Sequence, residues 1–155
     1  MRSTPRKPGD PVTRVDVVDV LLVEDDDGDA LMIEEIFEEH RIPNRLHRVH
    51  NGVEAMEFLR RDGGHRDAPR PALVLLDLNM PRMNGHEVLD AVKRDGDLKR
   101  IPVVVFTTSN ADEDVTRCYH SMANAYVAKP ADYDGFGATV HTIDRFFCSV
   151  AQRPA

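Results

Sequence analysis

The sequence lacks any long hydrophobic run and has few cysteines, and each shortage excludes a class of protein. No apolar stretch approaches the roughly 18 residues needed to cross a bilayer. Arg2, Arg6 and Lys7 are not followed by an apolar stretch, so we expect no secretory signal of the usual kind. The two cysteines, Cys118 and Cys148, belong to no close-spaced motif, and reduced, packed thiols are expected. We therefore expect a cytoplasmic protein.

An excess of positive charge is missing as well. The 27 acidic residues outnumber the 20 basic ones, and the net charge is −7 at pH 7. This sign argues against nucleic acid or an anionic membrane as the main partner. The 155 residues suffice for one domain with a real core. Residues 1–14 carry prolines and a glycine among polar residues and predict a disordered leader, so a single domain is expected over residues 15–152, with no output domain.

Five short segments, four of them apolar runs, predict strands, and segments with helical spacing alternate with them. The second strand alternates charged and apolar side chains, as is typical of a sheet edge. The expected strands are 17–23, 45–49, 72–76, 101–106 and 125–128. The expected helices begin at about residues 28, 51, 85, 112 and 133, and the last two end at about residues 122 and 150.

This alternation predicts an α/β fold with a parallel sheet and helices on both faces. With five strands and an edge-like second strand, we expect a flavodoxin-like, doubly wound (βα)5 sandwich. The predicted strand order is 2-1-3-4-5, with strands 1 and 3 adjacent where the order reverses.

Polar side chains follow four of the predicted strands. Glu24 and Asp25 follow the first strand, Asp77 the third, and Lys129 the fifth, while Thr107 lies at the end of the fourth. The carboxyl ends of parallel strands meet at one edge, so these side chains should lie together. A lone aspartate there is more often a helix cap, but three crowded carboxylates repel one another and one lysine cannot neutralise them. A hard divalent cation such as Mg²⁺ resolves the deficit.

A bound cation would allow phosphoryl chemistry at this edge. The cation offsets the repulsion between a carboxylate nucleophile and phosphoryl oxygens, so Asp77 can attack phosphorus and form an acyl phosphate. Lys129 can then pair with the phosphate as a point charge, and the Thr107 hydroxyl can donate to it. Each residue type has a role in this chemistry.

These residues and their spacing resemble the receiver domain of two-component response regulators, over roughly residues 17–150. Less specific features, among them the IPVVVF strand and the aromatic end of the last helix at Phe146 and Phe147, are similar to the stand-alone receivers that partner bacterial phytochrome histidine kinases. The residues that carry the family resemblance are Glu24, Asp25, Asp77, Pro81, Gly85, Thr107, Lys129 and Pro130.

The resemblance implies a role for each matching position. It implies that Mg²⁺ is the cofactor, that a sensor histidine kinase supplies the phosphoryl group, and that the protein catalyses only its own phosphorylation and dephosphorylation. The peptide bond before the matching proline, Pro130, is often cis in the family. The implied roles are phosphoacceptor for Asp77, direct metal ligand for Asp25, ligand through water for Glu24, main-chain carbonyl ligand for Asn79, phosphoryl contacts for Thr107 and Lys129, and a switch aromatic coupled to Thr107 for Tyr126.

With no output domain expected, the signal should leave through a docking surface. We expect phosphorylation to change a surface around the fifth strand and its flanking helices. In the family this face often forms symmetric dimers. Phe146 and Val150, at the edge of the buried stripe of the last helix, suggest a homodimer through the fifth strand and that helix.

Two other classes stay open. A receiver-like adaptor would keep the fold without phosphorylation, although every reactive position is filled. A phosphatase of the haloacid dehalogenase type also forms an aspartyl phosphate, but it needs an acid two residues after the nucleophile, where this chain has Asn79. Flavin binding is disfavoured because the acids following the first strand would repel its phosphate.

Three histidines and one cysteine are interpreted as structural rather than functional residues. His47 and His50 are expected on the surface, His86 as an exposed helix residue, and Cys118 in the core. The fourth helix is expected to carry Val115, Cys118, Tyr119 and Met122 on one side.

Overall fold

Strands and helices alternate strictly along the chain, as the sequence predicts. The computed structural model describes residues 17–150, so the predicted leader over residues 1–14 lies outside the described residues. The bounds are β1 Asp19–Val23, α1 Asp27–Glu39, β2 Arg45–Val49, α2 Gly52–Arg60, β3 Leu73–Leu76, α3 Gly85–Arg94, β4 Val103–Thr107, α4 Asp112–His120, β5 Ala125–Ala128 and α5 Tyr133–Arg145. Short 3-10 turns, η1 Gly63–His65 and η2 Leu98–Arg100, lie before β3 and β4, and a π-helical turn, η3 Phe146–Val150, extends α5.

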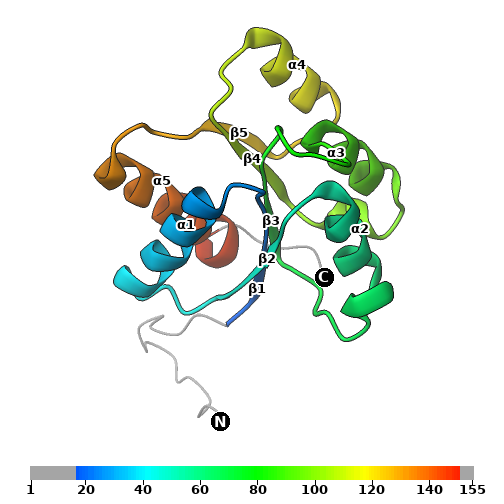
Figure 1. The fold of residues 1–155 in the computed structure, drawn as a ribbon, viewed down its shortest axis with the longest axis horizontal. Coiled ribbons are helices and arrows are strands. Elements are labelled where there is room, and N and C mark those ends of the chain that lie inside the picture. Colours follow the sequence, from blue (N-terminus) through cyan, green and yellow to red (C-terminus); the bar gives the residue numbers. More distant parts are fainter. Residues whose placement is uncertain (1–16, 151–155) are drawn as a thin grey trace, which may run out of the picture.

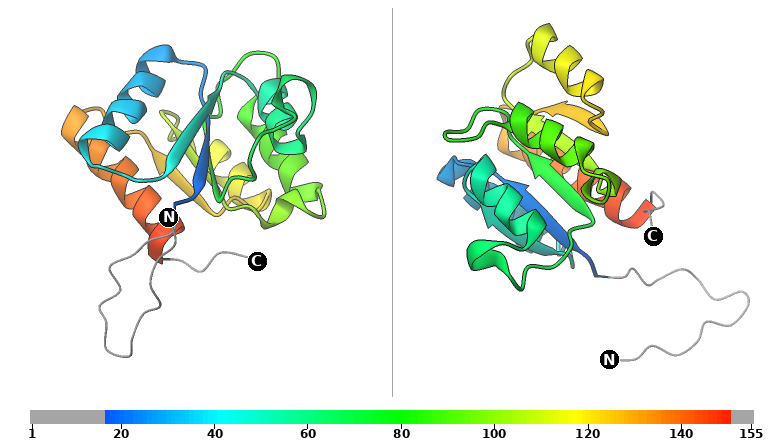
Figure 2. Two further views of the ribbon diagram at one scale, coloured as in Figure 1. Left: turned by 90° about the horizontal axis from the view of Figure 1, so that it is seen from below. Right: turned by 90° about the vertical axis from the view of Figure 1, so that its right-hand side faces the viewer.

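The five strands form one parallel sheet in the order β2-β1-β3-β4-β5. This confirms the predicted flavodoxin-like topology. Helices α1 and α5 cover one face of the sheet, and α2, α3 and α4 cover the other (Figure 1). The same three layers are visible from the two further directions in Figure 2.

The sheet separates two hydrophobic clusters, because successive strand side chains point to opposite faces. In β4, Val103 and Val105 pack toward α2, α3 and α4, whereas Val104 and Phe106 pack toward α1 and α5. Both faces are covered, which explains why the strands are nearly continuous apolar runs.

Side chains at the carboxyl edge of the sheet fix where several helices begin. Asp26 accepts hydrogen bonds from the main-chain nitrogens of Gly28 and Asp29 and caps α1. Asn84 caps α3 in a reciprocal capping box with Glu87. These caps hold the loops that carry the site against the sheet.

The fourth helix differs from the prediction. It ends at His120 rather than Met122, and Cys118 is its buried residue. Tyr119 is 50% exposed and Met122 is 69% exposed, so neither of these two residues of the predicted side is buried with Cys118. Within residues 17–150, no helix is long and apolar enough to span a membrane.

Candidate functional site

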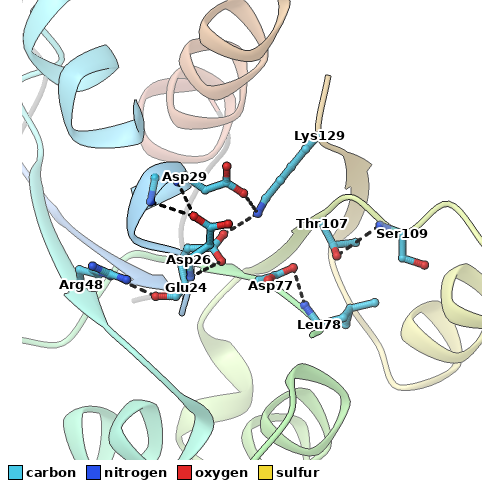
Figure 3. A network of polar contacts seen from close by, with 10 residues as sticks. Glu24, Asp26, Asp29, Arg48, Asp77, Leu78, Thr107, Ser109 and Lys129 are labelled. Atoms are coloured by element: carbon cyan, nitrogen blue, oxygen red, sulfur yellow. Dashed lines mark hydrogen bonds and ion pairs between the residues drawn. The ribbon is translucent and has the colours of Figure 1, made fainter. Parts of the chain in front are cut away.

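Four of the predicted site residues lie together at the carboxyl edge of the sheet, at the ends of neighbouring strands, namely Glu24, Asp77, Thr107 and Lys129 (Figure 3). Main-chain hydrogen bonds continue the sheet into them. The nitrogen of Asp77 donates to the carbonyl of Val23 at 3.1 Å, and the nitrogen of Lys129 donates to that of Thr107 at 2.8 Å. The backbone under the site is therefore as firmly placed as the strands themselves.

Three carboxylates converge at this edge. Glu24, Asp25 and Asp77 each offer an oxygen, and these oxygens lie within 4.8 Å of one another. Glu24 and Asp77 are buried, at 1% and 8% exposure, while Asp25 is exposed and leaves the cluster open to solvent. An all-oxygen donor set that is partly open to water fits a hard divalent cation. The metal-ligand role of these residues stays a prediction.

The Lys129 ammonium binds two acids of this edge. Its Nζ donates to Glu24 Oε1 at 2.5 Å and to Asp29 Oδ2 at 2.7 Å, and its side chain is only 4% exposed. Burial works to lower the pKa of Lys129, but hydrogen bonds to Asp29 and Glu24 outweigh it and raise that pKa. Burial raises the pKa of Glu24 to about 7, while Lys129 opposes that rise and Asp77 adds to it. The lysine is thus held as an ammonium beside the acid cluster.

Asp29 was not among the predicted site residues. It lies in the first turn of α1, where an acidic residue is commonly explained by the helix dipole alone. The signal that could have identified it is topological, since the first turn of α1 begins at the same edge as the strand ends. Arg48 was missed as well. Its Nε donates to the Glu24 carbonyl at 3.0 Å and its Nη1 pairs with Asp27 at 2.8 Å.

Asp77 is held by its own loop. Its Oδ1 accepts a hydrogen bond from the Leu78 nitrogen at 2.9 Å, which leaves Oδ2 as the less constrained oxygen. The Gly85 nitrogen donates to the Leu78 carbonyl at 2.9 Å, and a Cβ on Gly85 would collide with the Asp77 carbonyl oxygen. Asn79 lies exposed two residues after Asp77, and its role as a main-chain ligand stays a prediction.

Thr107 and Tyr126 both contact the segment that follows β4. Thr107 is fully buried, and its Oγ1 accepts from the Ser109 nitrogen at 3.5 Å. The Tyr126 hydroxyl donates to the Ser109 carbonyl at 2.7 Å. The structure therefore brings the two predicted switch residues to one segment. All peptide bonds in the described chain are trans, including the one before Pro130, in contrast to the cis bond common in the family.

A partly buried chain of polar contacts leads from Ser109 to α3. The Ser109 hydroxyl donates to Asp114 Oδ2 at 2.6 Å, and Asp114 Oδ1 lies 3.0 Å from His86 Nε2. His86 Nδ1 lies 3.7 Å from the Cys118 thiol. His86 is only 8% exposed, so the prediction of an exposed helix residue was wrong, while the core position of Cys118 is confirmed. The Ser109 hydrogen bond, followed by that of His86, lowers the pKa of Asp114.

The predicted interface residues lie away from the acidic cluster. Phe146 is 51% exposed in η3 and packs edge-on against Phe147, with ring centroids 5.0 Å apart. The side chain of Val150 lies outside what the structure describes. Two histidines, His47 and His50, were predicted on the surface. His47 Nε2 lies 2.8 Å from Asp19 Oδ1, and His50 Nδ1 lies 3.2 Å from Glu54 Oε1.

Comparison with known proteins finds relatives that match most of this chain. A family model described as the response regulator receiver domain matches residues 20–141. The response regulator Rcp1 of Synechocystis sp. is 39% identical over 136 residues, which cover 88% of this chain and 92% of Rcp1. The probable methanogenesis regulatory protein FilR2 of Methanothrix harundinacea is 38% identical over 147 residues, which cover 94% of each chain.

Solved structures of similar proteins superpose closely on this fold. The phosphorylated cyanobacterial phytochrome response regulator RcpA matches with a TM-score of 0.86 and 38% identity, covering 90% of this chain and all of its own. The Mn²⁺-bound form of Rcp1 matches with a TM-score of 0.83 and 38% identity, covering 89% of this chain and 99% of its own.

Proposed function

The chain belongs to the response regulator receiver domain family of signalling proteins, and on that premise we propose that Asp77 accepts a phosphoryl group from a phosphohistidine of a sensor histidine kinase. We propose that the reaction requires Mg²⁺, bound by Asp77, Asp25, Glu24 through water, and the carbonyl of Asn79. The observation that carries this proposal is the convergence of three acidic side chains within 4.8 Å beside a buried ammonium.

The proposed transfer uses the contacts already described. Asp77 Oδ1 is held by the Leu78 nitrogen, so Oδ2 attacks phosphorus. The P–N bond to the donor imidazole breaks as the O–P bond forms, and the imidazole leaves. When bound, the cation offsets the negative charge that gathers between carboxylate and phosphoryl oxygens.

Lys129 and Thr107 would stabilise the product. Lys129 shares its ammonium between two acids, and we propose that it moves to the new phosphoryl oxygens because they are the stronger anionic partner. Thr107, buried at the end of β4, would donate its hydroxyl to the same group. Tyr126 would respond through Ser109, which both residues contact.

A phytochrome-type kinase is the first candidate partner, because Rcp1 and RcpA are similar and RcpA is named as a phytochrome response regulator. FilR2 is nearly as similar and is named for regulation of methanogenesis, so kinases of other classes belong in the same test. The proposed place of action is the cytoplasm, and the proposed receiver unit spans residues 15–152.

The output is proposed to be a docking surface around β5 and its flanking helices. Three large apolar side chains are exposed on these helices or directly after them. Tyr119 lies in α4, Met122 follows α4, and Phe146 follows α5. We propose a homodimer through β5 and the last helix, including Phe146 and Val150. Light scattering with and without phosphorylation tests it, and a monomeric mass in both states contradicts it.

The central experiment measures intact mass after incubation with acetyl phosphate and Mg²⁺. The wild type should gain one phosphoryl group, and chelation of the metal should prevent the gain. Asp77→Asn should not gain it, whereas Asp67→Asn, at an exposed loop position, should behave as wild type. No gain with this donor or with a kinase would favour a phosphorylation-independent adaptor. Steady hydrolysis of phosphomonoesters would favour a phosphatase.

A further inference from the structure

Two histidines from different helices face each other far from the acidic cluster. His40 immediately follows α1, His141 lies in α5, and their Nδ1 atoms are 3.3 Å apart. The ring centroids are 4.9 Å apart and the rings are inclined by 70°. His40 is exposed and His141 is partly exposed, so solvent and ions can reach the pair.

The spacing of the two nitrogens matches a tetrahedral metal site. Zinc–imidazole bonds of about 2.0–2.1 Å in tetrahedral geometry place two ligand nitrogens about 3.3–3.4 Å apart. The observed 3.3 Å is the separation expected for two ligands of one zinc ion, and without a metal it also allows one imidazole N–H to donate to the other ring.

The two ligands are held by well-packed backbone. The His40 nitrogen donates to the Ile36 carbonyl at 2.9 Å, which fixes the end of α1. Ile36 and Val140 belong to the hydrophobic cluster between the sheet, α1 and α5. Gly137 lies one turn before His141, and a Cβ placed there would be 3.6 Å from His40 Nε2, so the His40 ring lies close against α5. Ligands on rigid elements lose little freedom on binding a metal.

One buried acid near the pair favours a cation. Asp144 follows His141 by about one helical turn. Asp144 is buried, at 5% exposure, and its electrostatic interaction with His141 is favourable when the histidine is charged. A bound zinc ion would occupy the same favourable field.

We propose that His40 and His141 form a binding site for Zn²⁺ or a similar borderline transition metal that connects α1 to α5. Imidazole nitrogen suits zinc, whereas Mg²⁺ prefers oxygen ligands, so the two sites select different ions. Water or a ligand from another molecule would complete the coordination. Helix α1 spans 13 residues from the acidic edge, roughly 20 Å, so the zinc site is separate from the acidic cluster.

The test is zinc titration of the full chain, without a histidine tag, in excess Mg²⁺ to saturate the acidic cluster. Calorimetry should show one Zn²⁺ bound per chain, and Co²⁺ should give the visible absorption of tetrahedral coordination. His40→Gln and His141→Gln should each weaken zinc binding by about 10-fold or more, since even outer partners of metal ligands contribute that much. His120→Gln, at an exposed position in α4, is the matched control and should bind as wild type.

Two results would overturn the proposal. Equal zinc affinity in the wild type and both ligand variants would remove the two histidines from the site. Zinc binding that disappears in excess Mg²⁺ would assign the ion to the acidic cluster. The thermal midpoint without zinc, measured for every variant, separates loss of metal binding from loss of folding.

Discussion

Asn44 connects the start of the sheet to α5, and its replacement should have a large and pH-dependent effect on stability. Its Oδ1 accepts from the Val18 nitrogen at 3.1 Å, and its Nδ2 donates to Asp144 Oδ1 at 2.9 Å. Asn44 and Asp144 are 6% and 5% exposed. Asn44→Ala would leave a main-chain donor and a buried carboxylate without these partners, each at a penalty of about 1–3 kcal/mol. The expected loss of unfolding free energy is about 2–5 kcal/mol near neutral pH.

The loss should be smaller in mild acid. Burial raises the pKa of Asp144, whereas the Asn44 hydrogen bond lowers it. When folding raises the pKa of a carboxyl group, the resulting stabilisation is fully present below the pKa of the unfolded state, about 4. It is lost as the pH rises through the pKa of the folded state. Removing Asn44 raises the folded pKa further, so the destabilisation should grow between pH 5 and pH 8.

Urea unfolding at both pH values measures the effect. Asn124→Ala is a matched control, because Asn124 Oδ1 accepts from the Val103 nitrogen at 2.8 Å but contacts no buried acid. It should cost about 1–3 kcal/mol, and the cost should be the same at both pH values. Adding Asp144→Asn to Asn44→Ala should recover part of the loss and remove its pH dependence. A loss for Asn44→Ala that is below 1 kcal/mol, or equal at both pH values, would refute the reasoning.

Two further outcomes are expected. Gly85→Ala should destabilise the protein by more than about 1 kcal/mol and weaken Mg²⁺ binding, because the added Cβ would displace the Asp77 backbone. Gly96→Ala is the control, since a Cβ at that position meets open space, and it should be nearly neutral. Urea unfolding and Mg²⁺ titration measure the two effects. Burial raises the pKa of the Cys118 thiol to about 11, and Cys148 is also buried, so neither should react with a thiol reagent at pH 8 until urea unfolds the chain. Rapid reaction of the folded protein would contradict this.

The sequence contains enough information to predict the fold, because four of the five strands are short apolar runs bounded by clear turn residues and the remaining strand, β2, has the alternation of a sheet edge. The bounds of β2 and β5 agree with the prediction, and the strand order is confirmed. The end of α4 was harder to predict. Cys118, Tyr119 and Met122 follow Val115 at the helical offsets i+3, i+4 and i+7, but only tertiary packing decides how wide a stripe is buried.

The candidate site was predictable to the extent that topology determines it. Glu24, Asp25 and Asp77 converge because parallel strands end at one edge. The Asp29 contact with Lys129 and the burial of His86 against Asp114 depend on how helices dock on the sheet. Spacing along the chain carries no direct signal for such contacts between elements.

The arrangement of polar contacts around Asp77 has a mechanical consequence. The two apolar clusters have no buried residue in common, and they are connected by the strands whose alternate side chains belong to each cluster. At the rim, Lys129 reaches Asp29 at the start of α1, while Thr107 leads through Ser109 to Asp114 in α4. A small anionic group at this rim would act on the helices of both faces of the sheet simultaneously, so helices on opposite sides of the molecule would respond to the same chemical event.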